Sequence, residues 1–296
     1  MEIYMKLSVS SYSFSQYIKS GKLTQLSCVA KAKEMGFEGI EFTDLKPEGE
    51  RNLENQLLYA AEIKAEAERV GIDIVAYTIG ANLYKPTEEE REAEVERVKS
   101  QLDVAAALGA KVFRHDVCYK EKVDGVLTSF DKMLPTIAAA AREISEYARE
   151  LGIVTCTENH GFIAQDSDRV EKLFNAVDCD NYGILVDMGN FACADEDSAK
   201  AVSRLAPYAV HVHAKDFKKR AFGEPDYAGE AYIVTRGCNK LCACAVGDGD
   251  IPVAQCVAIL KRAEYDGYLS IEFEGLGDCI SEIAKGREFL LNIIGE

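Results

Sequence analysis

The 296-residue sequence lacks the marks of a membrane or exported protein. No apolar run approaches the roughly 18 residues that a membrane-spanning helix requires. Residues 1–6 lead into an alternating strand pattern, without the apolar segment of a secretory signal. Because ten cysteines occur without such a signal, we expect them to be thiols in a reducing compartment and the protein to be cytoplasmic.

Positive charge is also scarce, since 34 Lys and Arg side chains face 50 Asp and Glu side chains and leave a net charge of −16. A DNA or RNA partner requires a basic surface, and the densest basic stretch, residues 215–220, is too short to supply one. We therefore expect neither a nucleic-acid partner nor a membrane partner. The 48% hydrophobic and 28% charged residues are typical of a globular protein.

Four segments repeat one pattern, in which an amphipathic helix ends at a glycine and a β-rich run follows. The glycines are Gly36, Gly71, Gly109 and Gly152, at spacings of 35, 38 and 43 residues. A glycine directly after a helix accepts the left-handed conformation that turns the chain into the next strand. Internal periods of this length indicate a recurring strand-and-helix unit.

Eight β-rich runs alternate with helical patterns along the chain. The runs cover residues 7–13, 37–43, 72–79, 111–117, 153–159, 182–188, 209–214 and 268–273. Examples of the helical patterns are residues 52–70, 88–108, 136–151, 168–177, 253–262 and 280–294. Eight alternating units predict an α/β fold, a (β/α)8 TIM barrel, with residues 1–296 in a single domain. An open doubly wound sheet is the weaker alternative, because no G-x-G-x-x-G motif follows the first run.

One predicted connection is much longer than the others. Residues 217–251, between the seventh strand and its helix, are rich in glycine and are expected to form an irregular loop. A loop of this length is usually functional, often as a lid over the catalytic face. Its cysteines, Cys238, Cys242 and Cys244, lack a fourth nearby ligand, so we expect packed thiols rather than a metal site.

Ionisable residues gather where the predicted strands end, the side of a TIM barrel that holds the active site. All four histidines of the chain lie in these tails: His115, His160, His211 and His213. Because side chains alternate along a strand, one residue of each tail can face the barrel axis. For strands five to eight, one such choice is Glu158, Asp187, His213 and Glu272.

These four side chains, three carboxylates and a neutral imidazole, would place a formal charge of −3 in a water-poor barrel mouth. A carboxylate-rich site with one histidine suits Mn²⁺, Mg²⁺, Co²⁺ or Fe²⁺. Four protein ligands leave two positions of an octahedral ion open, enough for two neighbouring oxygens of a sugar. The competing interpretation is a set of ordinary ion pairs at the barrel rim. We disfavour it because the same strand ends carry no matching set of Lys or Arg residues.

Five motifs in the second half of the chain resemble the xylose isomerase-like barrel superfamily. They are Glu158-Asn-His160, Asp187-Met-Gly, His211-Val-His213-Ala-Lys-Asp216, Gly247-Asp-Gly-Asp250 and Tyr268-Leu-Ser-Ile-Glu272-Phe-Glu-Gly275. Within that superfamily, the chain is most similar to the sugar phosphate isomerase and epimerase group. This group includes ketose 3-epimerases, hydroxypyruvate isomerase and inosose dehydratase, and the likeness extends over nearly the whole chain.

The resemblance implies a divalent-metal-dependent sugar isomerase or epimerase. Glu158, Asp187, His213 and Glu272 would bind the ion, with Mn²⁺ favoured over Mg²⁺, Co²⁺, Fe²⁺ and Zn²⁺. Glu158 and Glu272 would also be the catalytic acid and base that move a proton beside the substrate carbonyl, through an enediolate that the metal stabilises. The substrate would be a small sugar or keto sugar.

Two departures from the family pattern weaken the transfer of function from the ketose 3-epimerases. Asn190 stands where many members have a substrate-binding histidine, and an amide cannot carry a proton at neutral pH. His115 and His160 are additions near the ion, where they would contact substrate or support the ligands. The leading alternative is therefore a lyase or dehydratase that performs β-elimination on a keto sugar, an inosose or a 3-keto-glycoside.

Two basic residues complete the candidate site. Lys215 and Arg114 are candidates for contact with substrate oxygens, and Asn190 could still hydrogen-bond a hydroxyl. A non-enzymatic alternative is a sugar-binding or assembly subunit that keeps the barrel without chemistry. The sequence leaves open whether the chain forms a homo-oligomer or works with a partner subunit.

Overall fold

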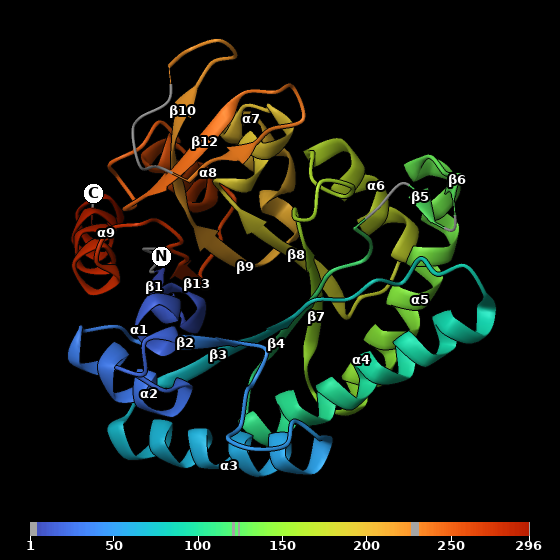
Figure 1. Cartoon of the computed structure of the whole chain (residues 1–296), viewed down its shortest axis with the longest axis horizontal. Coiled ribbons are helices and arrows are strands. Elements are labelled where there is room, and N and C mark those ends of the chain that lie inside the picture. The colour runs from blue at the N-terminus through green and yellow to red at the C-terminus, as the bar shows by residue number, and fades with distance from the viewer. Residues whose placement is uncertain (1–4, 120–121, 124, 226–230, 296) are drawn as a thin grey trace.

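The computed structural model describes residues 5–119, 122–123, 125–225 and 231–295. Within these residues, eight parallel strands close into a barrel in the order β1-β13-β9-β8-β7-β4-β3-β2 (Figure 1). They are β1 (Lys6–Ser10), β2 (Gly39–Thr43), β3 (Asp73–Ile79), β4 (Val112–His115), β7 (Val154–Glu158), β8 (Tyr182–Asp187), β9 (Ala209–Ala214) and β13 (Tyr268–Ile271). The predicted TIM barrel is confirmed, because each strand overlaps one of the eight β-rich runs.

Helices surround the barrel in the described part of the chain. They are α1 (Ser15–Lys19), α2 (Gln25–Glu34), α3 (Leu53–Val70), α4 (Glu88–Leu108), α5 (Phe130–Glu150), α6 (Ser167–Val177), α7 (Ser198–Leu205), α8 (Val253–Arg262) and α9 (Cys279–Ile294). None of them combines the length and apolarity that crossing a bilayer requires. The predicted start of α5 at residue 136 is wrong, because the helix begins at Phe130 and runs through Pro135.

Local signals in the sequence fix the ends of the long helices. Thr87 and Glu90 form a reciprocal capping box at the start of α4, which satisfies backbone N–H groups that have no partner within the helix. Gly71 and Gly109 end α3 and α4 with φ of 70° and 84°, a conformation that costs other residues free energy. The glycine repeat seen in the sequence therefore marks real helix ends.

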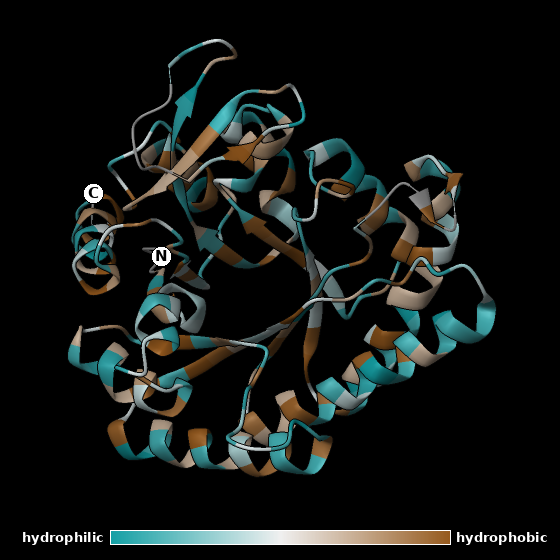
Figure 2. Ribbon diagram, in the orientation of Figure 1, coloured by the Kyte–Doolittle hydropathy of each residue, from teal (hydrophilic) through white to brown (hydrophobic). Residues whose placement is uncertain are grey.

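The core lies between the barrel and the inner faces of the helices. Bands of hydrophobic and hydrophilic residues alternate along α3, α4 and α5 (Figure 2), as expected when one face of each helix is buried. Ile63, Leu102 and Ile144, one from each of these helices, are 0% exposed. Burial of each such side chain contributes about 1.5–3 kcal/mol, so this layer holds the strand ends in place.

The connection after β9 is not the irregular loop that the sequence predicted. It forms an antiparallel sheet of β10 (Asp216–Arg220), β12 (Lys240–Cys244) and β11 (Ile233–Val234), while residues 226–230 lie outside the described part. The Asp216 side chain accepts backbone N–H bonds from Gly247, Gly249 and Ile251 at 2.9–3.1 Å. These bonds tie the two ends of the connection together at the carboxyl end of β9. The sequence did not indicate the pairing of β10, β12 and β11, because glycine-rich segments surround these short strands.

Two short strands and three 3₁₀ helices complete the described elements. The strands β5 (Lys122–Val123) and β6 (Val126–Leu127) form a hairpin before α5. The 3₁₀ helices are η1 (Ser11–Phe14), η2 (Asn190–Ala194) and η3 (Ala206–Tyr208). η1 shortens the first predicted strand, because the Ser10 side chain accepts the N–H of Tyr12 and turns the chain there. η2 begins after Met188 and Gly189, the two residues beyond the end of β8, and carries Asn190 into the candidate site.

Candidate metal centre

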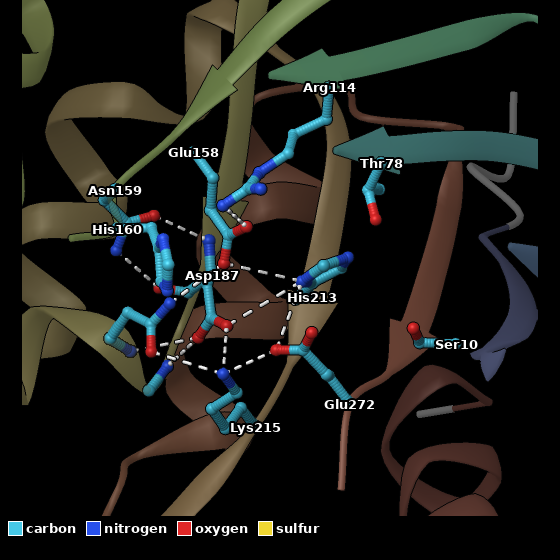
Figure 3. A network of polar contacts seen from close by, with 12 residues as sticks. Ser10, Thr78, Arg114, Glu158, Asn159, His160, Asp187, His213, Lys215 and Glu272 are labelled. Atoms are coloured by element: carbon cyan, nitrogen blue, oxygen red, sulfur yellow. Dashed lines mark hydrogen bonds and ion pairs between the residues drawn. The ribbon is translucent and has the colours of Figure 1, made fainter. Parts of the chain in front are cut away.

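Four adjacent barrel strands bring together the four predicted metal ligands, Glu158, Asp187, His213 and Glu272, which are called the quartet below. Glu158 ends β7, Asp187 ends β8, His213 lies near the end of β9 and Glu272 follows β13 directly. The ladder aligns them, since Asp187 pairs with His213 and the Glu272 N–H donates to the Ala214 carbonyl at 3.1 Å. One ligand atom from each residue lies within 4.8 Å of the others (Figure 3). The convergence expected from strand alternation is therefore present.

Two buried atoms of this quartet lack a hydrogen-bond partner: His213 Nδ1 and Asp187 Oδ2. His213 Nδ1 lies 3.6 Å from Glu158 Oε1, 3.8 Å from Asp187 Oδ2 and 3.6 Å from Glu272 Oε2. Leaving a buried polar atom without a hydrogen bond costs about 1–3 kcal/mol. A cation among these four atoms would satisfy both, so the donor set fits a divalent metal ion.

The other oxygen of Asp187 is held by the backbone of the turn that follows. Oδ1 accepts N–H bonds from Gly189 at 2.8 Å and from Asn190 at 2.9 Å. The Asn159 side chain bonds both the N–H and the carbonyl of Asp187, at 2.8 and 2.9 Å. These contacts fix the carboxylate so that Oδ2 alone faces the other ligands.

Glu158 is fixed through both of its oxygens. Arg114 Nη2 lies 2.8 Å from Oε2, and the Asn190 amide donates to Oε1 at 2.9 Å. Burial alone would raise the pKa of Glu158, but the positive charges of Arg114 and His213 outweigh it and lower the pKa to about 2. Arg114 and Asn190, predicted to bind substrate, thus contact a proposed ligand in this structure and hold it as a carboxylate.

Lys215 lies among the ligands rather than at the rim. Its Nζ is 2.5 Å from Glu272 Oε2 and 3.3 Å from Asp187 Oδ2, and it donates to the Asn190 side chain at 3.3 Å. The expectation that the carboxylates lack cationic partners is therefore wrong, since Arg114 and Lys215 both pair with them. The two buried atoms without hydrogen bonds, rather than uncompensated negative charge, therefore favour a metal ion.

The two added histidines have different positions. His160 Nδ1 lies 3.0 Å from Asp116 Oδ1, and its side chain remains 46% exposed beside Glu158. His115 instead packs 6.2 Å from the Phe113 ring, on the opposite face of β4 from Arg114, with Nδ1 2.9 Å from the Asp116 carbonyl. Burial lowers the pKa of His115 to about 4. His115 therefore lies apart from the quartet in this structure, and its contact with substrate stays a prediction.

Sequence reasoning missed two buried acids that support the site, Glu41 and Asp116. Asp116 accepts from Arg114 at 2.7 Å, from the Tyr119 hydroxyl at 2.7 Å and faces His160. Glu41, in β2, contacts the rings of His211 and His213. Asp116 lies within the predicted fourth β-rich run, and Glu41 is a glutamate within a buried strand, which is a signal that the sequence does contain.

The cysteine motif after β9 forms no ion site in the described structure. Cys238 is exposed, and Cys242 and Cys244 are partly buried in β12. The groups of ligand side chains close enough to share an ion, among the described residues, contain no cysteine. The prediction of packed thiols is wrong at Cys238, whose side chain is exposed, while Cys242 and Cys244 are partly covered.

Replacing Asp116 with asparagine should lower the free energy of unfolding by about 3 kcal/mol, because it removes the charge that a buried arginine faces. Urea unfolding followed by circular dichroism measures the change. Asp168→Asn is the control, since that ion pair with Lys172 lies on the surface and should be worth less than about 1 kcal/mol. Equal losses for both variants would contradict the structural role of Asp116.

The stability of chelator-treated protein should fall as pH rises above about 6.5. Burial alone would lower the pKa of His213, but Glu41, Glu272 and Glu158 outweigh it and raise the pKa well above its usual value. A folded-state pKa above the unfolded value gives stabilisation that is complete below about pH 6.5 and is lost as pH rises through the folded pKa. Thermal unfolding across pH measures this trend, and a His213→Gln variant should lose the His213 contribution to it. An unchanged pH trend in that variant would contradict the assignment.

The chain is similar to known proteins over most of its length. The sequence profile of the family described as "Xylose isomerase-like TIM barrel" matches residues 29–293. An inosose dehydratase of Clostridium perfringens (strain 13 / Type A) is 25% identical over 276 residues, covering 89% of this chain and 88% of the relative. The match confirms the resemblance expected from the strand-end motifs.

Solved structures share the fold at lower sequence identity. The probable 3-DHS dehydratase AsbF of Bacillus anthracis has a TM-score of 0.71 at 18% identity, over 97% of this chain and 99% of the other. The 3-keto-D-glucoside 4-epimerase YcjR of E. coli has a TM-score of 0.69 at 16% identity, over 97% of this chain and 99% of the other. At these identities the likeness establishes the fold alone.

Proposed function

Because the chain belongs to the xylose isomerase-like TIM barrel family, we propose that it is a divalent-metal-dependent enzyme acting on a keto sugar or an inosose. The reaction would begin with removal of the proton beside the substrate carbonyl. The observation that supports this most is the pair of buried atoms without hydrogen bonds, His213 Nδ1 and Asp187 Oδ2. His213 Nδ1 lies 3.6 Å from both Glu158 Oε1 and Glu272 Oε2.

Glu158, Asp187, His213 and Glu272 would hold the ion. Three carboxylates and one imidazole suit Mn²⁺ best, with Mg²⁺, Co²⁺, Fe²⁺ and Zn²⁺ as alternatives. A bound divalent ion would supply Lewis-acid polarisation of the carbonyl and would stabilise the negative charge that develops on its oxygen.

The protein side chains would move the protons. Glu158 is anchored as a carboxylate by Arg114 and Asn190, so it is oriented to accept the proton from carbon. Glu272 stands across the quartet, because β9 and β8 separate its strand from that of Glu158. Two carboxylates separated in this way could act on opposite faces of one sugar ring.

We favour dehydration as the outcome. A C–H bond beside the carbonyl breaks, a carbon–carbon double bond forms, and the hydroxyl on the next carbon leaves with a proton as water. His160 is a candidate for supplying that proton, because Asp116 holds Nδ1 while the ring stays 46% exposed. An inosose dehydratase that is 25% identical over 89% of this chain supports the same choice.

Epimerisation or isomerisation is the second candidate. The placement of Glu158 and Glu272 favours it, since one carboxylate can remove a proton and the other can return it to the opposite face or to the neighbouring carbon. A sugar-binding or assembly subunit without chemistry would convert none of these substrates.

Purified protein with added Mn²⁺ should be tested against an inosose, a 3-keto-glucoside and D-fructose. The expected result is a product lighter by one water from the inosose or the keto-glucoside, detected by mass spectrometry. An epimer of unchanged mass would select the second candidate. No conversion of any of the three with Mn²⁺, Mg²⁺ or Co²⁺ would contradict the proposed chemistry.

A further inference from the structure

Behind His213, on the side away from the other ligands, lies a glutamate that the chemistry above does not use. Glu41 is 0% exposed, and His213 Nε2 lies 3.0 and 3.1 Å from its two carboxylate oxygens. Its strand, β2, is not a neighbour of β9, because β1 and β13 separate them in the barrel order. The contact therefore crosses the barrel interior, where side-chain packing controls its geometry.

A second histidine fixes Glu41 from the same strand as His213. His211 Nε2 lies 2.6 Å from Glu41 Oε2, and the two imidazole rings stand at 82° with centroids 5.5 Å apart. A buried carboxylate is costly unless it is paired, and these two rings are the partners that the described structure gives it.

The position of Glu41 bears on which nitrogen of His213 can bind an ion. A neutral imidazole has one N–H, and the hydrogen bond made by one nitrogen decides which atom keeps the lone pair. Three carboxylates lie within 3.8 Å of Nδ1 and would attract the N–H to that side. An acceptor at Nε2 is needed to oppose them.

We propose that Glu41 is a positioning residue that accepts the Nε2–H of His213 and thereby turns the Nδ1 lone pair toward the ion, with His211 locking Glu41 in place. The inference rests on the proposed metal-dependent function. Substitution of a carboxylate that accepts the second N–H of a ligand histidine commonly weakens metal binding by about 10–100-fold.

The first test uses the unaltered protein with Zn²⁺, a diamagnetic probe ion. Histidine-selective ¹⁵N labelling is practical because the chain has four histidines. We expect a protonated Nε2 on His213, with its proton shifted downfield and slow to exchange, and an Nδ1 without a proton. An N–H on Nδ1, or a freely exchanging proton on Nε2, would overturn the proposal without any mutation.

The second test measures Mn²⁺ affinity by electron paramagnetic resonance. Glu41→Gln should weaken binding by about 10–100-fold, and His211→Gln should weaken it less. Glu38→Gln, a glutamine exchange beside the start of the same strand, is the matched control and should leave affinity unchanged. Unchanged affinity in Glu41→Gln overturns this inference alone, whereas no binding of either ion by the unaltered protein overturns the proposed function as well.

Discussion

Glutamine in place of Glu158 is expected to lower kcat by about 10²–10⁴-fold, with a smaller change in KM. The substitution keeps the size of the side chain but removes the charge that Arg114 faces at 2.8 Å and that would accept the substrate proton. Because the carboxylate accepts this proton only during the reaction, removing its charge should lower turnover more than it weakens substrate binding. Steady-state kinetics at saturating Mn²⁺ measure both constants.

A matched variant separates this effect from a general loss of stability. Glu143→Gln removes a glutamate of α5 that pairs with Lys99 on the surface, 57% exposed, and should leave kcat unchanged. Thermal unfolding of both variants shows whether each is folded at the assay temperature. Full turnover by a folded Glu158→Gln enzyme would rule out the assigned role of this carboxylate.

Removal of metal ions by a chelator is expected to abolish activity, and added Mn²⁺ or Co²⁺ should restore it. The ion should also stabilise the fold, by about 2.7 kcal/mol when its concentration is 100 times the dissociation constant. The physical reason is that the ion would bind His213 Nδ1 and Asp187 Oδ2, two buried atoms that make no hydrogen bond within the protein. Dialysis, activity recovery and the rise in unfolding temperature are the measurements.

Asp187→Asn provides the control for metal dependence. The amide could still accept the N–H bonds of Gly189 and Asn190 through its oxygen, but it lacks the charge that attracts the ion. The variant should therefore fold and show little rise in unfolding temperature on adding Mn²⁺. Undiminished activity of chelated wild-type protein would show that the reaction proceeds without an ion.

The barrel and the quartet could be predicted because both follow from local patterns. Gly71 and Gly109 mark helix ends, and β-rich runs between such ends fix the number of strand-and-helix units. Alternation along a strand then selects His213 on the inward face, and the shared carboxyl side of the strands brings it to Glu158 and Asp187.

The side-chain contacts that hold the quartet in place could not be predicted from local patterns. Glu41 reaches His213 across the barrel from a strand that is not its neighbour, and no spacing in the sequence encodes that contact. Lys215 was expected to contact substrate, yet its flexible side chain folds back onto Glu272. His115 shows a further limit of sequence-based prediction, because the end of a strand contains side chains of both faces. Its neighbour Arg114 lies on the inward face and contacts Glu158, whereas His115 packs near Phe113.

The pairing of Arg114 with Glu158 also changed the reason for expecting a metal ion. Net acidity at the barrel mouth is partly neutralised by Arg114 and Lys215, so charge alone does not require a cation. The orientation of His213 Nδ1 and Asp187 Oδ2 carries the argument instead, and side-chain orientation becomes visible only in the folded structure.

Solvent-deuterium incorporation is the most direct test of proton abstraction beside a carbonyl. The Mn²⁺-loaded protein should be incubated in D₂O with an inosose, a 3-keto-glucoside or a ketose, and the substrate and product analysed by NMR after the ion is removed. We predict deuterium at, or loss of hydrogen from, the carbon next to the carbonyl, with wild-type protein and not with Glu158→Gln. Conversion of substrate with that C–H bond left intact would contradict the mechanism.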